Sequence, residues 1–376
     1  MWAFVGLGAV FVVVTGLLPG ADAWNVAVDR GLPVLGFLLA ITILAELADR
    51  AGVFDVAATA CARAARGSVL RLYLLVAVLT TVTTVVMSLD TTAVLLTPVV
   101  LALADRVGIR PMPFAMLVVW LANTASLLLP VSNLTNLLAV QREYLSSLEF
   151  ARHMALPELA AVVVTVGYLW VLFRRDLSGR FDVPVDVEIS DRWTFRICAI
   201  ACVSLVPAVV AGVAPWAAAT IAAAVAIAVF AVRDRAGLGW QLIPWRLAIF
   251  TVGLFLSVMA IAEHGLTDAL SAALGSEPIT NALVSGAASN VVNNLPAYLA
   301  IEPAIPVGDT TRLFAVLLGT NAGPLILLWG SLATLLWRER CKARGVHISA
   351  IRFAAIGLGG VPLVLLASTA ALILSS

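Results

Sequence analysis

Four clusters of serine, threonine and asparagine interrupt otherwise apolar stretches of this 376-residue sequence. Their candidate functional members are, in chain order, Ser88, Asp90, Thr91 and Thr92; Asn123, Ser132, Asn133 and Asn136; Asn290, Asn293 and Asn294; and Asn321, Ser331 and Thr334. An unpaired polar group in an apolar medium is costly, so these side chains are expected to face protein, water or a ligand. Hydroxyls and amides can hydrogen-bond a small polar ligand or give oxygen ligands to a cation.

Asp90 is the one member of these clusters that can gain or lose a proton near neutral pH. A carboxylate in the middle of an apolar segment is expensive, and it usually serves function. We therefore expect Asp90 to be the coupling residue, exchanging a proton or binding a cation, while Ser88, Thr91, Asn133 and Asn294 contact the ligand. The alternative is a helix-capping aspartate, and one residue can serve both purposes.

The composition identifies a lipid bilayer as the solvent for most of the chain. Hydrophobic residues make up 62% of the sequence and charged residues 12%, and the mean hydropathy is +1.04. Soluble domains carry about 25% charged residues. Apolar runs of about 20 residues, which is the length that crosses hydrocarbon, recur along the chain. The net charge of +1 and the absence of a basic face argue against nucleic acid as a partner.

Apolar length predicts a series of full membrane spans. They cover residues 2–19, 31–48, 111–139, 154–173, 195–213, 215–232, 246–264, 311–337 and 351–374. Two further apolar stretches, 68–105 and 279–304, are interrupted by polar clusters near their middles. Each of these is predicted to be a re-entrant hairpin, a pair of helices that enters and leaves the membrane on the same side.

The distribution of arginine predicts how these segments are oriented. Arginines flank residues 68–105 on both sides, whereas Glu and Asp dominate the flanks of 279–304. The positive-inside rule therefore places the ends of the first hairpin in the cytoplasm and the ends of the second outside. The N-terminus is then cytoplasmic and the C-terminus external, as expected for a multi-pass protein of a bacterial inner membrane.

Similarity between the two halves predicts an inverted repeat. Residues 123–138 align without a gap on 321–336, and the spans around them run in opposite directions. Gly52 to Asp55 similarly parallels Gly265 to Asp268. We expect an N-terminal half at 1–173, a cytoplasmic linker at 174–196 and a C-terminal half at 197–376.

Proline and glycine are predicted to break two of the spans. Pro130 lies inside 111–139, and Gly323, Pro324 and Gly330 lie inside 311–337. Breaks at these positions would leave half-helices whose free backbone groups can bind ligands. The predicted fold class is therefore an all-α polytopic membrane protein with two inverted repeats, broken transmembrane helices and two re-entrant hairpins. Within this symmetry, the expected repeat partner of Asp90 is Asn293 or Asn294.

The motifs at these breaks resemble those of a known family. Residues 125–136 (ASLLLPVSNLTN), 293–296 (NNLP) and 330–337 (GSLATLLW) are similar to motifs of the ArsB-type arsenite/antimonite efflux permeases. These permeases belong to the ion transporter superfamily, which also contains sodium/proton antiporters and citrate and dicarboxylate carriers. The resemblance, over residues 31–340, implies a scaffold and a transport domain, elevator-like alternating access and frequent homodimers. It also implies proton-driven export of As(III) or Sb(III), sometimes with a cytosolic ATPase partner.

The sequence departs from this family at Asn321-Ala322-Gly323-Pro324, where such permeases tend to carry an aspartate before Leu-Gly-Pro. The chain is also shorter than is usual for that branch. The departure replaces a titratable side chain by an amide, close to one of the predicted breaks.

We therefore expect a secondary active membrane transporter, with proton-coupled arsenite or antimonite efflux as the leading hypothesis. The alternatives are a sodium- or proton-coupled carrier of organic anions such as dicarboxylates or citrate, and a sodium/proton antiporter. An enzyme would need a nucleophile with its base, or a metal cluster, at membrane depth, and the sequence shows neither. No cofactor or bound metal is expected beyond the coupling ion, H⁺ or Na⁺. The linker 174–196 mixes Arg with Asp and Glu, which favours a solvated connection over an ATPase docking site.

Overall fold

The computed structural model describes residues 2–15, 32–184, 189–235, 238–243 and 272–375, together with scattered positions between 245 and 260. The predicted span at 246–264 and the motif Gly265 to Asp268 lie wholly or largely outside the described residues. The described part is helical, and its one isolated β-bridge joins Ser68 to Arg180.

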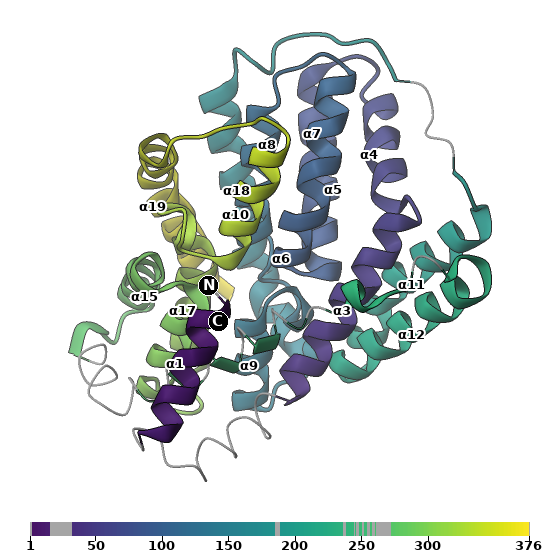
Figure 1. Cartoon of the computed structure of the whole chain (residues 1–376). Helices are drawn as coiled ribbons and strands as arrows, with labels where there is room; N and C mark the ends of the chain where they lie inside the picture. The colour runs from purple at the N-terminus through teal and green to yellow at the C-terminus, as the bar shows by residue number, and fades with distance from the viewer. Residues whose placement is uncertain are drawn as a thin grey trace.

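The first predicted hairpin is confirmed. It consists of α5 (Val69–Met87), α6 (Leu89–Thr91), the π-helix η2 (Thr92–Leu96) and α7 (Thr97–Arg106), and the chain reverses direction at α6 (Figure 1). α5 starts where the Ser68 hydroxyl accepts a hydrogen bond from the Arg71 amide at 3.4 Å. The helix ends at Ser88, whose backbone angles of φ 139° and ψ 165° turn the chain out of helical geometry.

The second hairpin is confirmed as well, and its tip has a similar conformation. α15 (Pro278–Val292) ends at Asn293, with φ 87° and ψ 155°, and α16 (Asn294–Ile301) and η7 (Glu302–Ala304) follow. Ser88 and Asn293 are thus equivalent turn residues of the two repeats. This alignment pairs Asp90 with Leu295, not with Asn293 or Asn294 as the sequence had suggested.

Two of the predicted spans are broken helices, as expected. In the first, α8 (Met112–Thr124) and α9 (Leu134–Glu143) flank a break that contains η3 (Pro130–Ser132). In the second, α17 (Thr310–Ala322) and α18 (Leu332–Ala343) flank a break that contains η8 (Gly323–Leu325). The first half-helices end, and the second begin, at positions that match in the gapless alignment of the two repeats. The structure therefore confirms that alignment.

The remaining helices pack around these elements. They are α1 (Trp2–Val14), α3 (Leu32–Arg50), α4 (Val53–Ala64), α10 (Ser147–Phe173), α11 (Arg192–Val210), α12 (Pro215–Arg233), η5 (Trp240–Leu242) and α19 (Ala350–Ser375). Within the described residues, five helices are long and apolar enough to cross a bilayer unbroken: α5, α10, α11, α12 and α19. α11 begins inside the predicted linker because Asp191 caps it, accepting a hydrogen bond from the Trp193 amide at 3.0 Å.

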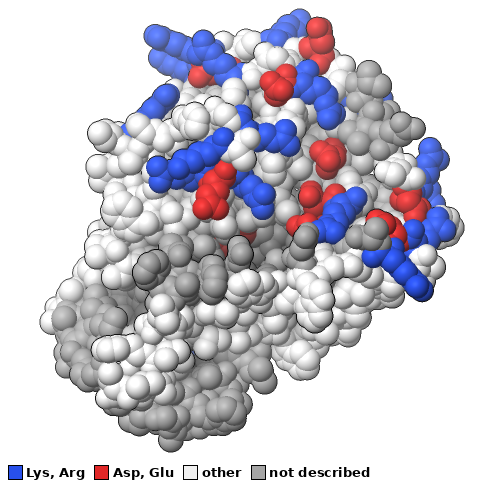
Figure 2. All heavy atoms as spheres, in the orientation of Figure 1, with Lys and Arg blue, Asp and Glu red and all other residues white. Residues whose placement is uncertain are grey.

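Two groups of helices pack closely together, and much of their exposed surface is aliphatic. α10 follows the first broken span and α19 follows the second, and these two helices pack along each other. α3 packs against α11 and α12. Many large aliphatic side chains remain exposed, among them Leu74, Val78 and Ile200. On the face shown in Figure 2, charged side chains gather over the upper part, and the described lower part is nearly free of them. A surface of this kind suits a protein surrounded by lipid.

Candidate functional site

Each hairpin packs its first arm against the helix break of its own repeat. In the N-terminal half, the Ser132 hydroxyl donates to the carbonyl of Val85 in α5 at 3.0 Å. In the C-terminal half, Asn290 of α15 bridges the break, because its Nδ2 donates to the Gly323 carbonyl at 2.8 Å and its Oδ1 accepts from the Leu327 amide at 2.9 Å. The hairpin tips and the breaks are therefore held together.

The second arm of each hairpin reaches the opposite repeat. α6 and η2 pack against α18, and α16 packs against α9. The tip of the second hairpin is fixed by Asn293, whose Nδ2 donates to the Trp329 carbonyl at 3.0 Å, and by the Asn294 amide, which donates to the Gly330 carbonyl at 2.9 Å. The structure thus brings all four predicted polar clusters into one region between the repeats.

Three of the predicted residues cap helices that start in this region. The Ser88 hydroxyl accepts from the Thr91 amide at 3.4 Å, Asn133 Oδ1 from the Thr135 amide at 3.3 Å, and the Ser331 hydroxyl from the Thr334 amide at 3.1 Å. α16 also starts here, at Asn293. Helix N-termini carry partial positive charge and free amides, so the region attracts oxygen-rich or anionic groups.

An amide network centred on Asn321 joins the two halves. Asn133 Nδ2 and the Thr135 hydroxyl both donate to Asn321 Oδ1, and Asn321 Nδ2 donates to Asn136 Oδ1 at 3.2 Å. All four side chains are buried. Asn321 therefore bonds across the repeat interface both as donor and as acceptor. An ionised carboxylate could not make the bond to Asn136 Oδ1, since it can only accept.

Two side-chain oxygens of the predicted clusters have no hydrogen-bond partner among the described residues. Asp90 is partly exposed as a residue, yet its Oδ1 is buried and makes no hydrogen bond. Asn123 Nδ2 donates to the Val119 carbonyl of its own helix at 2.9 Å, and its buried Oδ1 is also unpaired. α6, which carries Asp90, packs against both α8 and α18. Buried unpaired oxygens are rare in proteins, and these two are available to a proton, cation or substrate.

The other predicted residues bond to one another. The Ser88 hydroxyl donates to Thr91 Oγ1 at 3.0 Å, Thr84 bonds to Thr92 at 3.1 Å between the arms of the first hairpin, and Ser331 bonds to Thr334 at 2.9 Å. The sequence analysis missed Glu158, a buried carboxylate of α10 that bonds to the first helix break. Its signal was a lone acidic residue inside the apolar span 154–173.

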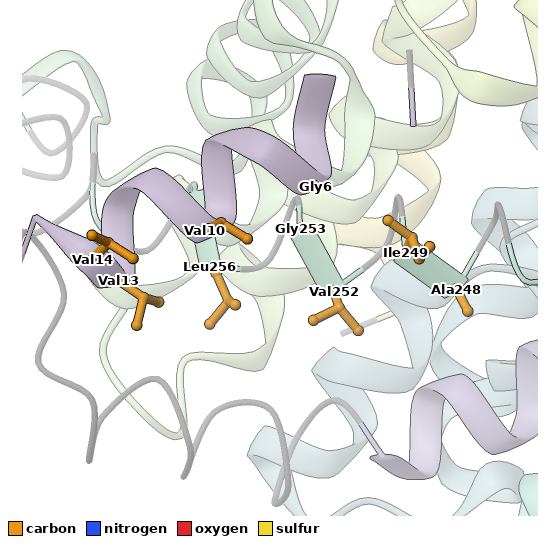
Figure 3. Close-up of a pocket in the computed structure, with 9 residues that line it drawn as sticks. All are labelled: Gly6, Val10, Val13, Val14, Ala248, Ile249, Val252, Gly253 and Leu256. Atoms are coloured by element: carbon orange, nitrogen blue, oxygen red, sulfur yellow. The ribbon is translucent and has the colours of Figure 1, made fainter. Parts of the chain in front are cut away.

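Large apolar hollows lie away from this region. The hollow in Figure 3, of about 530 Å³, is lined by aliphatic residues and glycines of α1 and of residues 248–256. Leu70, Val78 and Trp170 line a second, of about 590 Å³, between α5 and α10. Their described lining offers almost no polar group that could orient a small polar substrate, so we place the functional site at the four polar clusters.

Inverted repeats that meet through hairpin tips and helix breaks at a buried polar region define a membrane transporter. A model of the CitMHS family, described as citrate transporter, matches residues 1–319, and the chain belongs to this family.

Curated relatives extend the match over nearly the whole chain. The sequence is 29% identical to the arsenical pump membrane protein of Escherichia coli K12, in an alignment that covers 91% of this chain and 86% of the relative. It is 28% identical to the arsenical pump membrane protein of Yersinia enterocolitica, with the same coverage. An uncharacterized transporter of Mycobacterium tuberculosis is 25% identical over 80% of this chain and 74% of its own.

Among solved structures, the YdaH transporter of Alcanivorax borkumensis has the same fold. The two align with a TM-score of 0.61 at 15% sequence identity, covering 95% of this chain and 89% of that one. This likeness supports the polytopic inverted-repeat architecture.

We expect Asn321→Ala to loosen the contact between the two halves. The substitution removes the partner of three buried groups, and each buried group left unpaired costs about 1–3 kcal/mol. The melting temperature of the purified variant, monitored by size exclusion after heating, should be lower than that of the wild type. Its transport rate should also be lower. Asn281→Ala is the matched control, since Asn281 is a buried asparagine that bonds to Gly275 and Glu277 at the start of its own hairpin. Wild-type transport by Asn321→Ala would show that the network is dispensable.

Proposed function

We propose that the protein is a proton-coupled exporter of arsenite and antimonite. The chemistry of the site carries this proposal, because its predicted residues are hydroxyls and amides with Asp90 as the one ionisable group. As(OH)₃ and Sb(OH)₃ are neutral near pH 7, and hydroxyl and amide groups can both donate to and accept from them. The similarity to arsenical pump membrane proteins over 91% of the chain supports the same substrate class.

In this proposal the transport region alternates between the two sides of the membrane, and Asp90 carries the coupling proton. Loading Asp90 with a proton outside and releasing it inside would drive a neutral metalloid in the opposite direction. We place the protein in a bacterial inner membrane with its N-terminus in the cytoplasm, as the arginine distribution suggests.

Transport of an organic anion is the second candidate. Two observations favour it: α6, α9, α16 and α18 all begin at the site, and the matching family model is described as citrate transporter. Partial positive charges at four helix N-termini could hold a carboxylate without an arginine. In this case Na⁺ or H⁺ would be the coupling ion.

Expression in a bacterium that lacks its own arsenite pump separates the two candidates. We expect resistance to arsenite and antimonite to rise, and everted membrane vesicles to accumulate arsenite when a pH gradient is imposed. Citrate and succinate uptake are measured in the same cells. Uptake of either organic acid without any metalloid resistance would replace the first proposal by the second.

We further propose that the protein is a homodimer. We also consider the segment after α10 as a docking site for a cytosolic ATPase, as an alternative to a plain solvated connection. This segment is attached to both flanks of the first hairpin, because the Phe181 amide donates to the Gly67 carbonyl at 2.9 Å and Arg110 pairs with Asp176. Light scattering of the purified protein tests the dimer, and co-purification with and without residues 178–191 tests the docking. Co-purification that survives the deletion would contradict docking at this segment.

A further inference from the structure

Glu158 is a buried carboxylate in the apolar helix α10, and none of the roles above uses it. Only 5% of the surface of Glu158 is exposed. Glu158 Oε2 accepts a hydrogen bond from the Leu127 amide at 2.8 Å, and the Leu128 amide also bonds to this carboxylate. Leu127 and Leu128 lie in the break between α8 and α9. The carboxylate therefore satisfies backbone donors that the interrupted helix leaves without intrahelical partners.

The same stretch of backbone leads directly to the site. Asn136 Nδ2 donates to the carbonyls of Ser126, at 2.7 Å, and Leu129, at 3.1 Å. Asn136 Oδ1 in turn accepts from Asn321. The amides of Leu127 and Leu128 thus bond to Glu158. The carbonyls of Ser126 and Leu129 bond to Asn136, a member of the inter-repeat network. The Leu127 N–H and the Ser126 carbonyl belong to the same peptide group, so a change at the carboxylate reaches Asn136 through a single peptide group.

Among the described residues, the groups that hold the break of the C-terminal repeat are neutral. Asn290 bonds there to Gly323 and Leu327, as described above. Gly357 of α19 lies so close that a Cβ atom on it would be 2.3 Å from the Leu325 carbonyl oxygen. α19, the repeat equivalent of α10, contains no Asp or Glu. One break is therefore held by a group that can be protonated, and the other by neutral groups.

Few charges surround Glu158. α8 has no ionisable residue. Those on α10 itself are Glu149, Arg152, His153 and Tyr168. Those on the helices that contact α10 are Arg71 and Tyr73 of α5, Arg192, Arg196, Cys198 and Cys202 of α11, Arg312 of α17, and Arg352 of α19. The arginines lie near the first turns of their helices, and Tyr73 bonds to the Val166 carbonyl, two helical turns beyond Glu158. No ion pair to Glu158 occurs among the described residues, so the two backbone amides are its described polar contacts.

We propose that Glu158 is a positioning residue for the N-terminal half of the site and a second proton-exchanging group of the transporter. When ionised, it holds residues 126–129 through two charge-assisted hydrogen bonds and keeps Asn136 against Asn321. Proton binding at the carboxyl group removes its negative charge, weakens both bonds and loosens the break. The inference deepens the proposed proton-coupled transport by adding a group that links proton uptake to the shape of the site.

Amide hydrogen exchange of the purified wild-type protein tests the positioning step without any substrate. We expect peptides that contain Leu127 and Leu128 to lose protection as the pH is lowered, beyond the intrinsic pH dependence of exchange. Peptides covering 323–331, the neutral break of the other repeat, provide the internal reference. In Glu158→Gln the first break should exchange at least about tenfold faster than in the wild type at high pH, where the wild-type carboxylate is ionised, since bonds to charged groups are the stronger ones. The difference should shrink as the pH is lowered and the wild-type carboxylate becomes protonated. Parallel behaviour of the two breaks at all pH values would overturn the proposal.

Arsenite transport in vesicles provides the second test. Glu158→Gln, checked for monodispersity by size exclusion, should transport with a flattened pH profile, whereas a merely structural role would lower the rate equally at every pH. Glu149→Gln is the matched control, because Glu149 lies on the same helix in a capping box that glutamine preserves. A wild-type pH profile for Glu158→Gln would contradict the proton-exchanging role. If arsenite is not transported at all, the proposed function fails, while the exchange experiment still decides the positioning role.

Discussion

Asp90→Asn is expected to abolish gradient-driven transport. The substitution keeps the size of the side chain and leaves the Ser88 cap of α6 in place, but the amide can neither bind nor release a proton. Because Asp90 Oδ1 is buried without a partner, the native structure is expected to tolerate the change. Substrate could still equilibrate across the membrane, so the accumulation ratio in everted vesicles should fall to about one when the carboxylate no longer couples it to the gradient.

The measurement compares arsenite accumulation with and without an imposed pH gradient. Asp105→Asn serves as the matched control, since Asp105 lies in the same hairpin but is exposed near the end of α7. We expect this control to behave as wild type. Accumulation by Asp90→Asn with an unchanged dependence on pH and sodium would exclude Asp90 as the coupling residue, which would then be sought at Glu158, Glu46, Asp49 or Glu263.

Much of the fold could be predicted because the bilayer restricts what the sequence can do. Apolar length locates the helices, and a polar interruption within such a length must be a turn or a break buried in protein. The turns at Ser88 and Asn293 and the breaks after Thr124 and Ala322 follow from this rule. Helix ends were less predictable, since they depend on caps such as Asp191, which extends α11 back to Arg192.

The interactions between the two repeats could not be predicted from the sequence. Asn321 was identified as the position where a carboxylate is absent, but its bonds to Asn133 and Asn136 join residues nearly 190 positions apart. The hairpin register was predicted only to within one residue, and the actual tips pair Asp90 with Leu295. Glu158 was missed because attention went to clusters of polar residues, whereas its partners are backbone amides that no residue type reveals.

The second hairpin depends on glycine for its contact with the broken helix α17. A Cβ atom at Gly319 would lie 2.0 Å from Ser285 Oγ and 2.2 Å from the Ala282 carbonyl oxygen, both on α15. At Gly323 it would lie 2.4 Å from the Cα of Gly286. Several of these neighbours are backbone atoms, so a side-chain rotation alone cannot make room. Close approach of this kind is how small residues pack helices in membranes.

Gly319→Ala should therefore push α15 away from α17 and displace the tip at Asn293. Overpacking of a rigid interface costs about 3 kcal/mol, which for a chain of this size lowers the melting temperature by about 4 °C. Transport should be lost even in the fraction that remains folded, because Asn290 would no longer bridge Gly323 and Leu327. The melting temperature in detergent and arsenite transport in vesicles are the two measurements.

Gly167→Ala is the control that isolates packing from backbone effects. Gly167 also lies within a membrane helix, α10, but a Cβ atom there would meet nothing within 4 Å. Alanine forms helix more readily than glycine by about 1 kcal/mol, so this variant should melt at or above the wild-type temperature. If Gly319→Ala were as stable and active as Gly167→Ala, α15 and α17 could separate without cost. The close contact would then not be what holds the second hairpin tip at the site.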